Sequence, residues 1–155
     1  RIQLTKKEIE TYSLVDGDFL FVRVNGSRNL VGKCAIYRPI EPIVAYNDHI
    51  IRVRLRPLMQ QHFYHWYLLS DVGKTGIELH TVTSAGQFTI SGNGLRDIWA
   101  VLPPLDEQKV ISIHLDTKCA QVDQLICLKQ AKIDKLNEYK KSLIYEYVTG
   151  KKEVS

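Results

Sequence analysis

The last third of the chain opens with Leu102-Pro103-Pro104-Leu105-Asp106-Glu107-Gln108-Lys109 and then runs to Gly150 without an internal glycine or proline. Proline belongs in the first turn of a helix and glycine just past its end. The segment therefore predicts a single helix of about 43 residues, roughly 65 Å long. Because an average globular helix has only about 11–12 residues, we expect this one to act as a spacer between other parts or to pack against a partner.

A heptad-like seam follows this helix in alternating steps of three and four residues. Lys129 and Lys140 fill two of its places. We expect the seam to pack against a second helix, with the two lysines weakening a two-stranded pairing and helping to fix its register. The alternative is a helix that lies on its own globular domain, although such a domain is too small to cover the whole length. The apolar members of the seam are Leu115, Cys119, Val122, Ile126, Ile133, Leu136, Leu143 and Tyr147.

The composition is that of an ordinary globular protein, with 45% hydrophobic and 25% charged residues among 155. No run approaches the roughly 18 apolar residues of a membrane span. The three cysteines are odd in number and widely spaced, which fits a reducing cytoplasm better than a disulfide framework or a zinc motif. The first residue is Arg1 rather than methionine, so we interpret the chain as a fragment of a longer protein.

The arginines are distributed unevenly. All eight lie in residues 1–102 and none lies in the predicted helix. Arginine suits bidentate contact with phosphate or guanine, whereas lysine is common on solvated helix faces. This distribution favours recognition by the first part of the chain and assembly by the helix.

We place the domain boundary at Leu102-Pro103-Pro104, with a domain over residues 1–102, a long helix over 103–150 and a tail over 151–155. The first part alternates short β-rich runs with turn signals, and the expected class is α+β: a strand-rich domain followed by one long C-terminal helix. Residues 72–84 and 87–90 complete a mixed region. The predicted elements are strands at Phe19–Val24, Leu30–Tyr37, Ile43–Tyr46 and His49–Leu55, a helix at Gln60–Ser70 and a turn at Ser91–Gly94.

The loop after the first predicted strand concentrates residue types that bind nucleic acids. Asparagine and arginine read adenine and guanine edges in the major groove, while serine and lysine suit phosphate oxygens. The alternative is an ordinary hydrophilic hairpin loop. The candidates are Arg23, Asn25, Ser27, Arg28 and Asn29 for base edges, and Lys33 for phosphates.

Two further groups extend the candidate site. Arg52, Arg54 and Arg56 alternate with apolar residues, so in a strand they share one face and form a possible phosphate track. The alternative is a solvated face paired with carboxylates. A second polar cluster, which turn chemistry alone also explains in part, lies near residue 90. From these groups we select Arg52 and Arg54 for phosphates, and Ser84, Gln87 and Asn93 for bases. Lys74 is a further candidate for phosphates.

Catalytic or metal-binding signatures are not found. His62 and His65 are three residues apart, but no nearby acidic pattern completes a metal site. The sequence contains no phosphate-binding loop, dinucleotide fingerprint, nucleophile elbow or Cys/His nucleophile pattern. We therefore expect no catalytic residue and no metal ligand in this chain.

The motif that starts the helix also resembles that of a known family. Leu102-Pro103-Pro104-Leu105-Asp106-Glu107-Gln108, then Tyr139-Lys140-Lys141-Ser142-Leu143 and Val148-Thr149-Gly150-Lys151, are similar to the DNA-specificity subunits of type I restriction-modification systems. Upstream, Asp16–Phe21 followed by Val31-Gly32-Lys33 looks like the start of the family's target-recognition domain, and Gln87–Gly92 looks like its end. The middle of the domain, at about residues 38–85, is less similar.

The resemblance implies a non-catalytic subunit that recognises double-stranded DNA. In this family, each target-recognition domain is followed by a spacer helix, and two such helices pack antiparallel and set the distance between two half-sites. Modification subunits dock there and methylate adenine with S-adenosylmethionine, and restriction subunits use ATP and magnesium, so we expect these cofactors only on partner subunits. With one domain and one helix, this chain resembles half of a specificity subunit, which can pair with the other half or self-associate.

Two other functions remain open from the residues alone. A pure assembly protein, in which the helix matters and the globular part is a cap, predicts no salt-sensitive DNA affinity. The recognition end of an adenine methyltransferase or a fused restriction enzyme predicts catalytic motifs upstream of Arg1. The resemblance to specificity subunits, by contrast, implies a bacterial or archaeal protein located in the cytoplasm.

Overall fold

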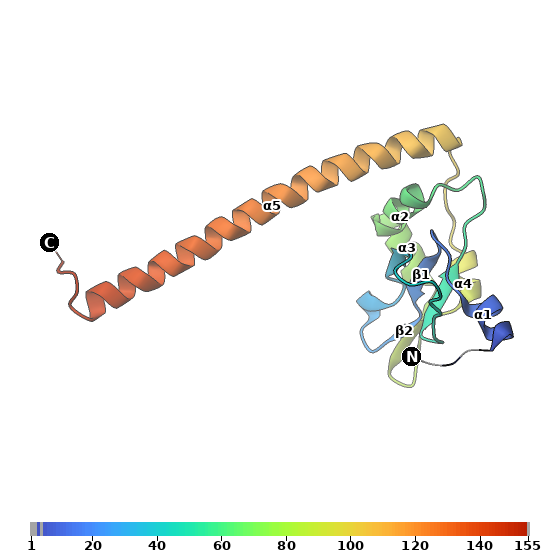
Figure 1. The fold of residues 1–155 in the computed structure, drawn as a ribbon, viewed down its shortest axis with the longest axis horizontal. Coiled ribbons are helices and arrows are strands. Elements are labelled where there is room, and N and C mark those ends of the chain that lie inside the picture. Colours follow the sequence, from blue (N-terminus) through green and yellow to red (C-terminus); the bar gives the residue numbers. More distant parts are fainter. Residues whose placement is uncertain (1–2, 4, 155) are drawn as a thin grey trace. The chain divides into compact units, whose positions relative to one another are not determined.

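The computed structural model describes residue 3 and residues 5–154, which divide into two compact units between Ser112 and Ile113 (Figure 1). The first unit contains two small sheets and several short helices, and the second consists mainly of a long helix. The α+β class predicted from the sequence is therefore confirmed.

The first sheet has β1 (Phe19–Val22) at its centre, with β3 (Cys34–Ile36) and β4 (Ile50–Val53) antiparallel on either side. Phe19 is aligned with Ile36 on one neighbour and with Val53 on the other. Alternate side chains of a strand point to opposite faces, which places every second residue of β1 toward the core.

The larger core cluster lies between this sheet and α2 (Gln61–Leu69). Phe19 and Phe21 are buried there against Phe63 and Tyr64 of the helix. Full burial of one such side chain contributes roughly 1.5–3 kcal/mol, so these four aromatic residues fix the position of α2 on the sheet.

The second sheet has β6 (Gln87–Ile90) between β2 (Val24–Asn25) and β5 (Thr81–Ser84), all antiparallel. β5 and β6 form a hairpin whose turn residues, Ala85 and Gly86, have φ values of 48° and 78°. Two successive positive φ values are typical of the turn whose twist matches that of the flanking strands. The hairpin is therefore a defined two-residue turn with almost no side chain at its tip.

A second core cluster supports this sheet. Ile90 packs with Val31 and with Ile77 of α3 (Asp71–Leu79). Residue Ser70 accepts a hydrogen bond from the Gly73 amide and thereby caps the start of α3.

The predicted strand at Phe19–Val24 is wrong as a single element, because the chain changes sheets at Arg23. The Arg23 amide donates to His49 O at 2.8 Å, and its carbonyl accepts from the Ile90 amide at 3.0 Å. The first hydrogen bond joins Arg23 to the residue just before β4 in the first sheet, and the second joins it to β6 in the second sheet. The apolar run is continuous in sequence, so only the tertiary pairing reveals the break.

The predicted strand at Leu30–Tyr37 is also shorter than expected. A 3-10 turn, η1 (Arg28–Leu30), precedes it, and the Gly32 amide donates to Val22 O at 2.8 Å before β3 begins. Gly32 has a φ of 75°, and a Cβ at this position would collide with Ile77. This glycine is therefore required both by its conformation and by its packing.

Three smaller differences complete the comparison. The strand expected at Ile43–Tyr46 is only an isolated bridge between Ser13 and Ala45. The turn expected at Ser91–Gly94 is the start of α4 (Gly92–Arg96), because the Ser91 hydroxyl accepts from the Gly94 amide at 3.0 Å. The helix α1 (Lys6–Tyr12) is not among the predicted elements, although Thr5 and Glu8 form a capping box there.

The long helix α5 (Leu105–Val148) has 44 residues, which confirms the element predicted from its proline and glycine boundaries. Its first two turns belong to the first unit. Gln108 is fully buried there: its amide group donates to Leu58 O at 3.0 Å and to Pro103 O at 2.8 Å, and its Oε1 accepts from the Gln60 amide at 2.8 Å. The last residue of the Pro-Pro-Leu-Asp-Glu-Gln motif thus fastens the start of α5 to the start of α2.

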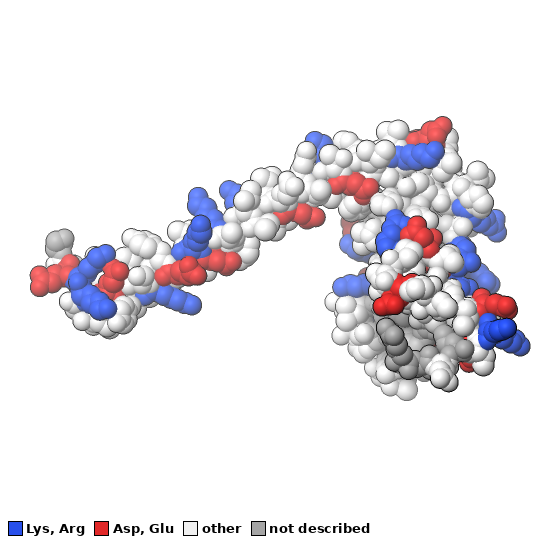
Figure 2. Space-filling view, in the orientation of Figure 1, with Lys and Arg blue, Asp and Glu red and all other residues white. Residues whose placement is uncertain are grey.

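In the second unit, α5 continues from Ile113 and ends with a glycine-capped turn in which Lys151 N donates to Glu146 O at 2.8 Å. Lysine and acidic side chains are interspersed along it (Figure 2). The predicted seam is open to solvent: Val122, Ile126, Ile133, Leu136 and Tyr147 are exposed, and the other three apolar members are partly buried. In the described part of the chain, α5 and the other helices lack a segment that is both long and apolar enough to cross a membrane.

Candidate functional site

The second sheet brings together two polar segments that are far apart in sequence. Asn25 of β2 lies opposite Phe88 of β6, and Gln87 lies opposite Ser84 of β5. The loop after Asn25 and the tip of the β5–β6 hairpin therefore meet at one end of the sheet. The Asn25 side chain accepts a hydrogen bond from the Ser27 amide at 2.9 Å, which fixes the turn that leads into η1.

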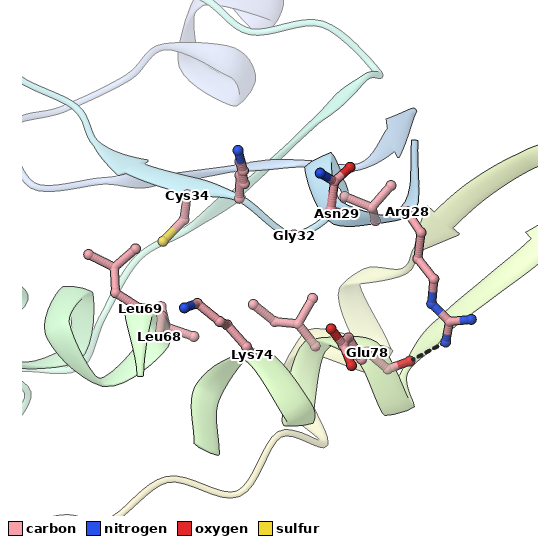
Figure 3. Close-up of a pocket in the computed structure, with 11 residues that line it drawn as sticks. Arg28, Asn29, Gly32, Cys34, Leu68, Leu69, Lys74 and Glu78 are labelled. Carbon is pink, nitrogen blue, oxygen red and sulfur yellow. Dashed lines mark hydrogen bonds between the residues drawn. The ribbon is translucent and has the colours of Figure 1, made fainter. Parts of the chain in front are cut away.

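A cleft of about 550 Å³ lies next to this end of the sheet, between η1 and the helices α2 and α3 (Figure 3). Its cations are Arg28, Lys33 and Lys74, and Glu78 is its carboxylate. The remaining lining residues are Asn29, Val31, Gly32, Cys34, Leu68, Leu69 and Ile77. The cleft therefore combines a largely apolar floor with a net positive charge.

The three cationic side chains of the cleft differ in how many contacts they make within the chain. Arg28 donates to the carbonyl oxygen of Glu78 at 3.3 Å and lies 6.0 Å from the centre of the Phe88 ring. Lys74 lies 4.0 Å from Asp71, whose side chain is fully exposed, so this ion pair contributes little. No residue that the structure describes forms a hydrogen bond or ion pair with the Lys33 side chain. Lys33 and Lys74 are thus available to an anion.

Cys34 adds no charge to the cleft at neutral pH. Burial raises the pKa of its thiol to about 11, so the neutral form predominates. The Sγ atom lies 4.0 Å from His65 Nδ1. The side chain therefore behaves as a small apolar group at the cleft wall.

Arg23 and Asn93 occupy other places. Arg23 donates to Asp48 O at 3.3 Å and lines a shallow hollow of about 310 Å³ with His49 and His80. Asn93 lies in α4, which follows the end of β6 opposite the hairpin tip. The structure thus separates both residues from the loop and hairpin that carry the other base-edge candidates.

Two of the three arginines predicted as a phosphate track, Arg52 and Arg54, already have partners within the chain. Arg52 donates to Ser13 O at 3.0 Å and to Thr11 O at 3.3 Å. Arg54 contacts both carboxylate oxygens of the buried Asp18, at 2.7 and 2.8 Å. β4 ends at Val53, so only Arg52 of the three lies in a strand. Their role as phosphate contacts stays a prediction, and they lie in or beside the first sheet rather than at the cleft.

Sequence reasoning singled out Lys74 but missed the helix that carries it. The signal was present, since Ser70 precedes Asp71 and caps the Gly73 amide. It also missed that the Arg28 side chain contacts Phe88 and Glu78. These residues are far from Arg28 in sequence, so no local pattern predicts the contacts. In the described residues, His, Cys, Asp and Glu side chains do not gather in threes as a metal site requires.

Comparison with known proteins adds an independent observation. No protein-family model matches the chain. The StySPI type I restriction enzyme specificity subunit of Salmonella potsdam is 30% identical over 97% of the chain, and the EcoKI specificity subunit of Escherichia coli is 25% identical over 96%. The chain spans about a third of the length of these relatives, 33% and 32% respectively. The resemblance carried by the sequence motifs is therefore confirmed: over nearly its whole length, the chain is similar to specificity subunits of type I restriction enzymes.

Proposed function

We propose that this chain recognises a sequence in double-stranded DNA and acts as one recognition module of a type I specificity subunit. The observation that carries the proposal is the convergence of two separate polar segments beside a cationic cleft. We call this region the recognition surface. It consists of Asn25, Ser27, Arg28, Asn29, Lys33, Lys74, Ser84 and Gln87.

The chemistry of the recognition surface supports both parts of DNA binding. Asn and Gln side chains can bond adenine in a bidentate manner, and arginine can do so with guanine. Gln87 is exposed at the start of β6, next to the tip of the β5–β6 hairpin. Lys33 and Lys74 at the adjoining cleft are suited to phosphates, which position a protein without reading sequence.

We infer that chemistry and assembly are divided among several chains. The similarity to specificity subunits supports a non-catalytic role, with S-adenosylmethionine, ATP and magnesium used by modification and restriction subunits. The exposed apolar seam of α5 supports a spacer that pairs with another helix and offers a docking site for modification subunits. These partners, and a cytoplasmic location, are proposals that follow from the family resemblance.

The experiment that tests the proposed surface removes its free cations one at a time. We expect Lys33→Ala and Lys74→Ala each to weaken binding to a fluorescein-labelled pool of randomised duplexes. Each should also lower the slope of log affinity against log salt by about 1, since one phosphate contact is lost. Fluorescence anisotropy over a salt series measures both quantities.

Lys7→Ala is the matched control. Lys7 is an exposed lysine of α1, and α1 leads to Thr11 and Ser13, which contact Arg52 on β4. β4 and β3 are opposite edges of the first sheet, so the control lies away from the cleft. Equal affinities and equal salt slopes in all three variants and the wild type would contradict the proposed surface.

A further inference from the structure

At position 26, the fold of the chain does not require a glycine. It follows β2, and a Cβ built on it meets no atom within 4 Å. Its φ is not in the left-handed region, unlike those of Gly32 and Gly86. Neither backbone conformation nor internal packing therefore explains a residue without a side chain at this position.

The main-chain groups of Gly26 are also free. Among the strands that the structure describes, β2 lies at the edge of its sheet and pairs only with β6. Arg23 O accepts from Ile90 N, and Asn25 lies opposite Phe88, so the amide and carbonyl of Gly26 point away from β6. Within the residues that the structure describes, no hydrogen bond uses either group. The Gly26 amide is thus an unused donor on an exposed residue.

The loop that follows Gly26 favours an anion. Residues 27–33 contain Arg28 and Lys33 but no aspartate or glutamate. The Ser27 side chain, next to Gly26, has no hydrogen-bond partner among the described residues. A main-chain amide in a cationic loop suits a phosphate oxygen, and backbone amides are common phosphate contacts in protein–DNA interfaces.

We propose that Gly26 is a point of close approach to the DNA backbone, where its amide N–H donates to a phosphate oxygen. This inference rests on the proposed function. Glycine is needed because a methyl group at this position would hold the phosphate away from the amide. The contact places the loop over residues 25–29 against one strand, with the β5–β6 hairpin beside it.

Gly26→Ala tests this inference because it separates binding from folding. The substitution should leave the thermal midpoint unchanged or raise it, since alanine fits the space and restricts the unfolded chain. Affinity for the randomised duplex pool should fall by about tenfold or more, as expected for losing a hydrogen bond to a charged acceptor. The salt slope should not change, because a neutral amide releases no counterion. Lys33→Ala, in contrast, should lower that slope.

Gly92→Ala is the control, since a Cβ on Gly92 also meets no atom within 4 Å and its φ is not positive. Gly92 begins α4, at the end of β6 opposite the hairpin tip, so its DNA affinity should equal that of the wild type. Wild-type affinity in Gly26→Ala would overturn the inference, and so would a loss of affinity accompanied by a lower thermal midpoint. A wild-type chain that retains no duplex would overturn the proposed function itself, and this inference with it.

Discussion

Asp18 carries a fully buried carboxylate whose charge the fold must compensate. Burial alone would raise the pKa of Asp18. Hydrogen bonds from Arg54 and from the Val15 amide, together with the charges of Arg54 and Arg52, outweigh burial and lower that pKa below its ordinary value. The hydrogen bonds to Asp18 in turn raise the pKa of Arg54. The ion pair therefore joins the segment before β1 to the residue after β4.

The sign of the pH dependence follows from this lowered pKa. An aspartate in the unfolded chain has a pKa of about 3.9, and the pKa of Asp18 in the folded chain lies below it. The ion pair therefore stabilises the folded chain at neutral pH, and its contribution is lost as the pH falls from about 4 through the folded pKa.

We predict that Asp18→Asn lowers the free energy of unfolding by about 1–3 kcal/mol at pH 7, because Arg54 and the Val15 amide lose a charged acceptor. The variant should also lose less stability than the wild type below about pH 4. Urea unfolding at neutral pH and in an acid series measures both effects. Asp16→Asn is the control: Asp16 is exposed and pairs with Arg38, which is also exposed, so the change should stay within about 0.5 kcal/mol. Identical acid slopes for Asp18→Asn and wild type would contradict this account.

Arg54 also shows which residue-level features the sequence could predict. Its alternation with Arg52 and Arg56 correctly signalled a strand nearby, and β4 is present. The partner of Arg54 could not be predicted, because Asp18 lies 36 residues away and no local pattern links them. The fully buried Gln108 was identified as part of a motif, but its role as a clamp depends on Leu58 and Gln60, which the fold brings to it.

At the scale of elements, α5 presents an apolar seam that has no partner among the described residues of the second unit. Exposed seam residues such as Ile126 and Leu136 are 59% and 57% accessible. A row of large apolar side chains at heptad spacing is typical of a helix that packs against another helix.

We predict that Ile126→Asp weakens helix-mediated self-association by about 2 kcal/mol or more, roughly thirtyfold, because pairing would bury an uncompensated carboxylate. Gln124→Asp introduces the same side chain two residues earlier, about 200° around the helix and away from the seam. It should associate like the wild type. Sedimentation equilibrium over a concentration series distinguishes these cases. Equal association of the two variants would contradict the assignment of the seam.

The bounds of an element could be predicted where nearby residues such as proline and glycine stop it. Pro103, Pro104 and Gly150 bound α5, and its observed limits, Leu105–Val148, lie within two residues of them. The break at Arg23 was not predictable, because the apolar run passes through it and the two halves pair with strands that come much later in the chain. The start of α4 was read as a turn because Gly92 and Gly94 are unusual in a helix.

At the scale of the molecule, the fold brings some of the candidate polar residues together and keeps others apart. Asn25, Ser27, Ser84 and Gln87 come together through β2 and β6, whereas Arg52 and Arg54 lie in or next to the other sheet and Asn93 follows the far end of β6. The residue types alone were enough to name these candidates, but only the pairing of the strands shows which of them lie close together.

The central claim is that this chain reads DNA sequence, and the most direct measurement is selection of the 155-residue chain against a library of randomised DNA duplexes at moderate salt. The account predicts enrichment of a short motif, with two inverted copies at a fixed spacing if α5 pairs with a second copy. Failure to enrich any sequence, together with no salt-dependent retention of DNA, would contradict it and favour a role in assembly alone.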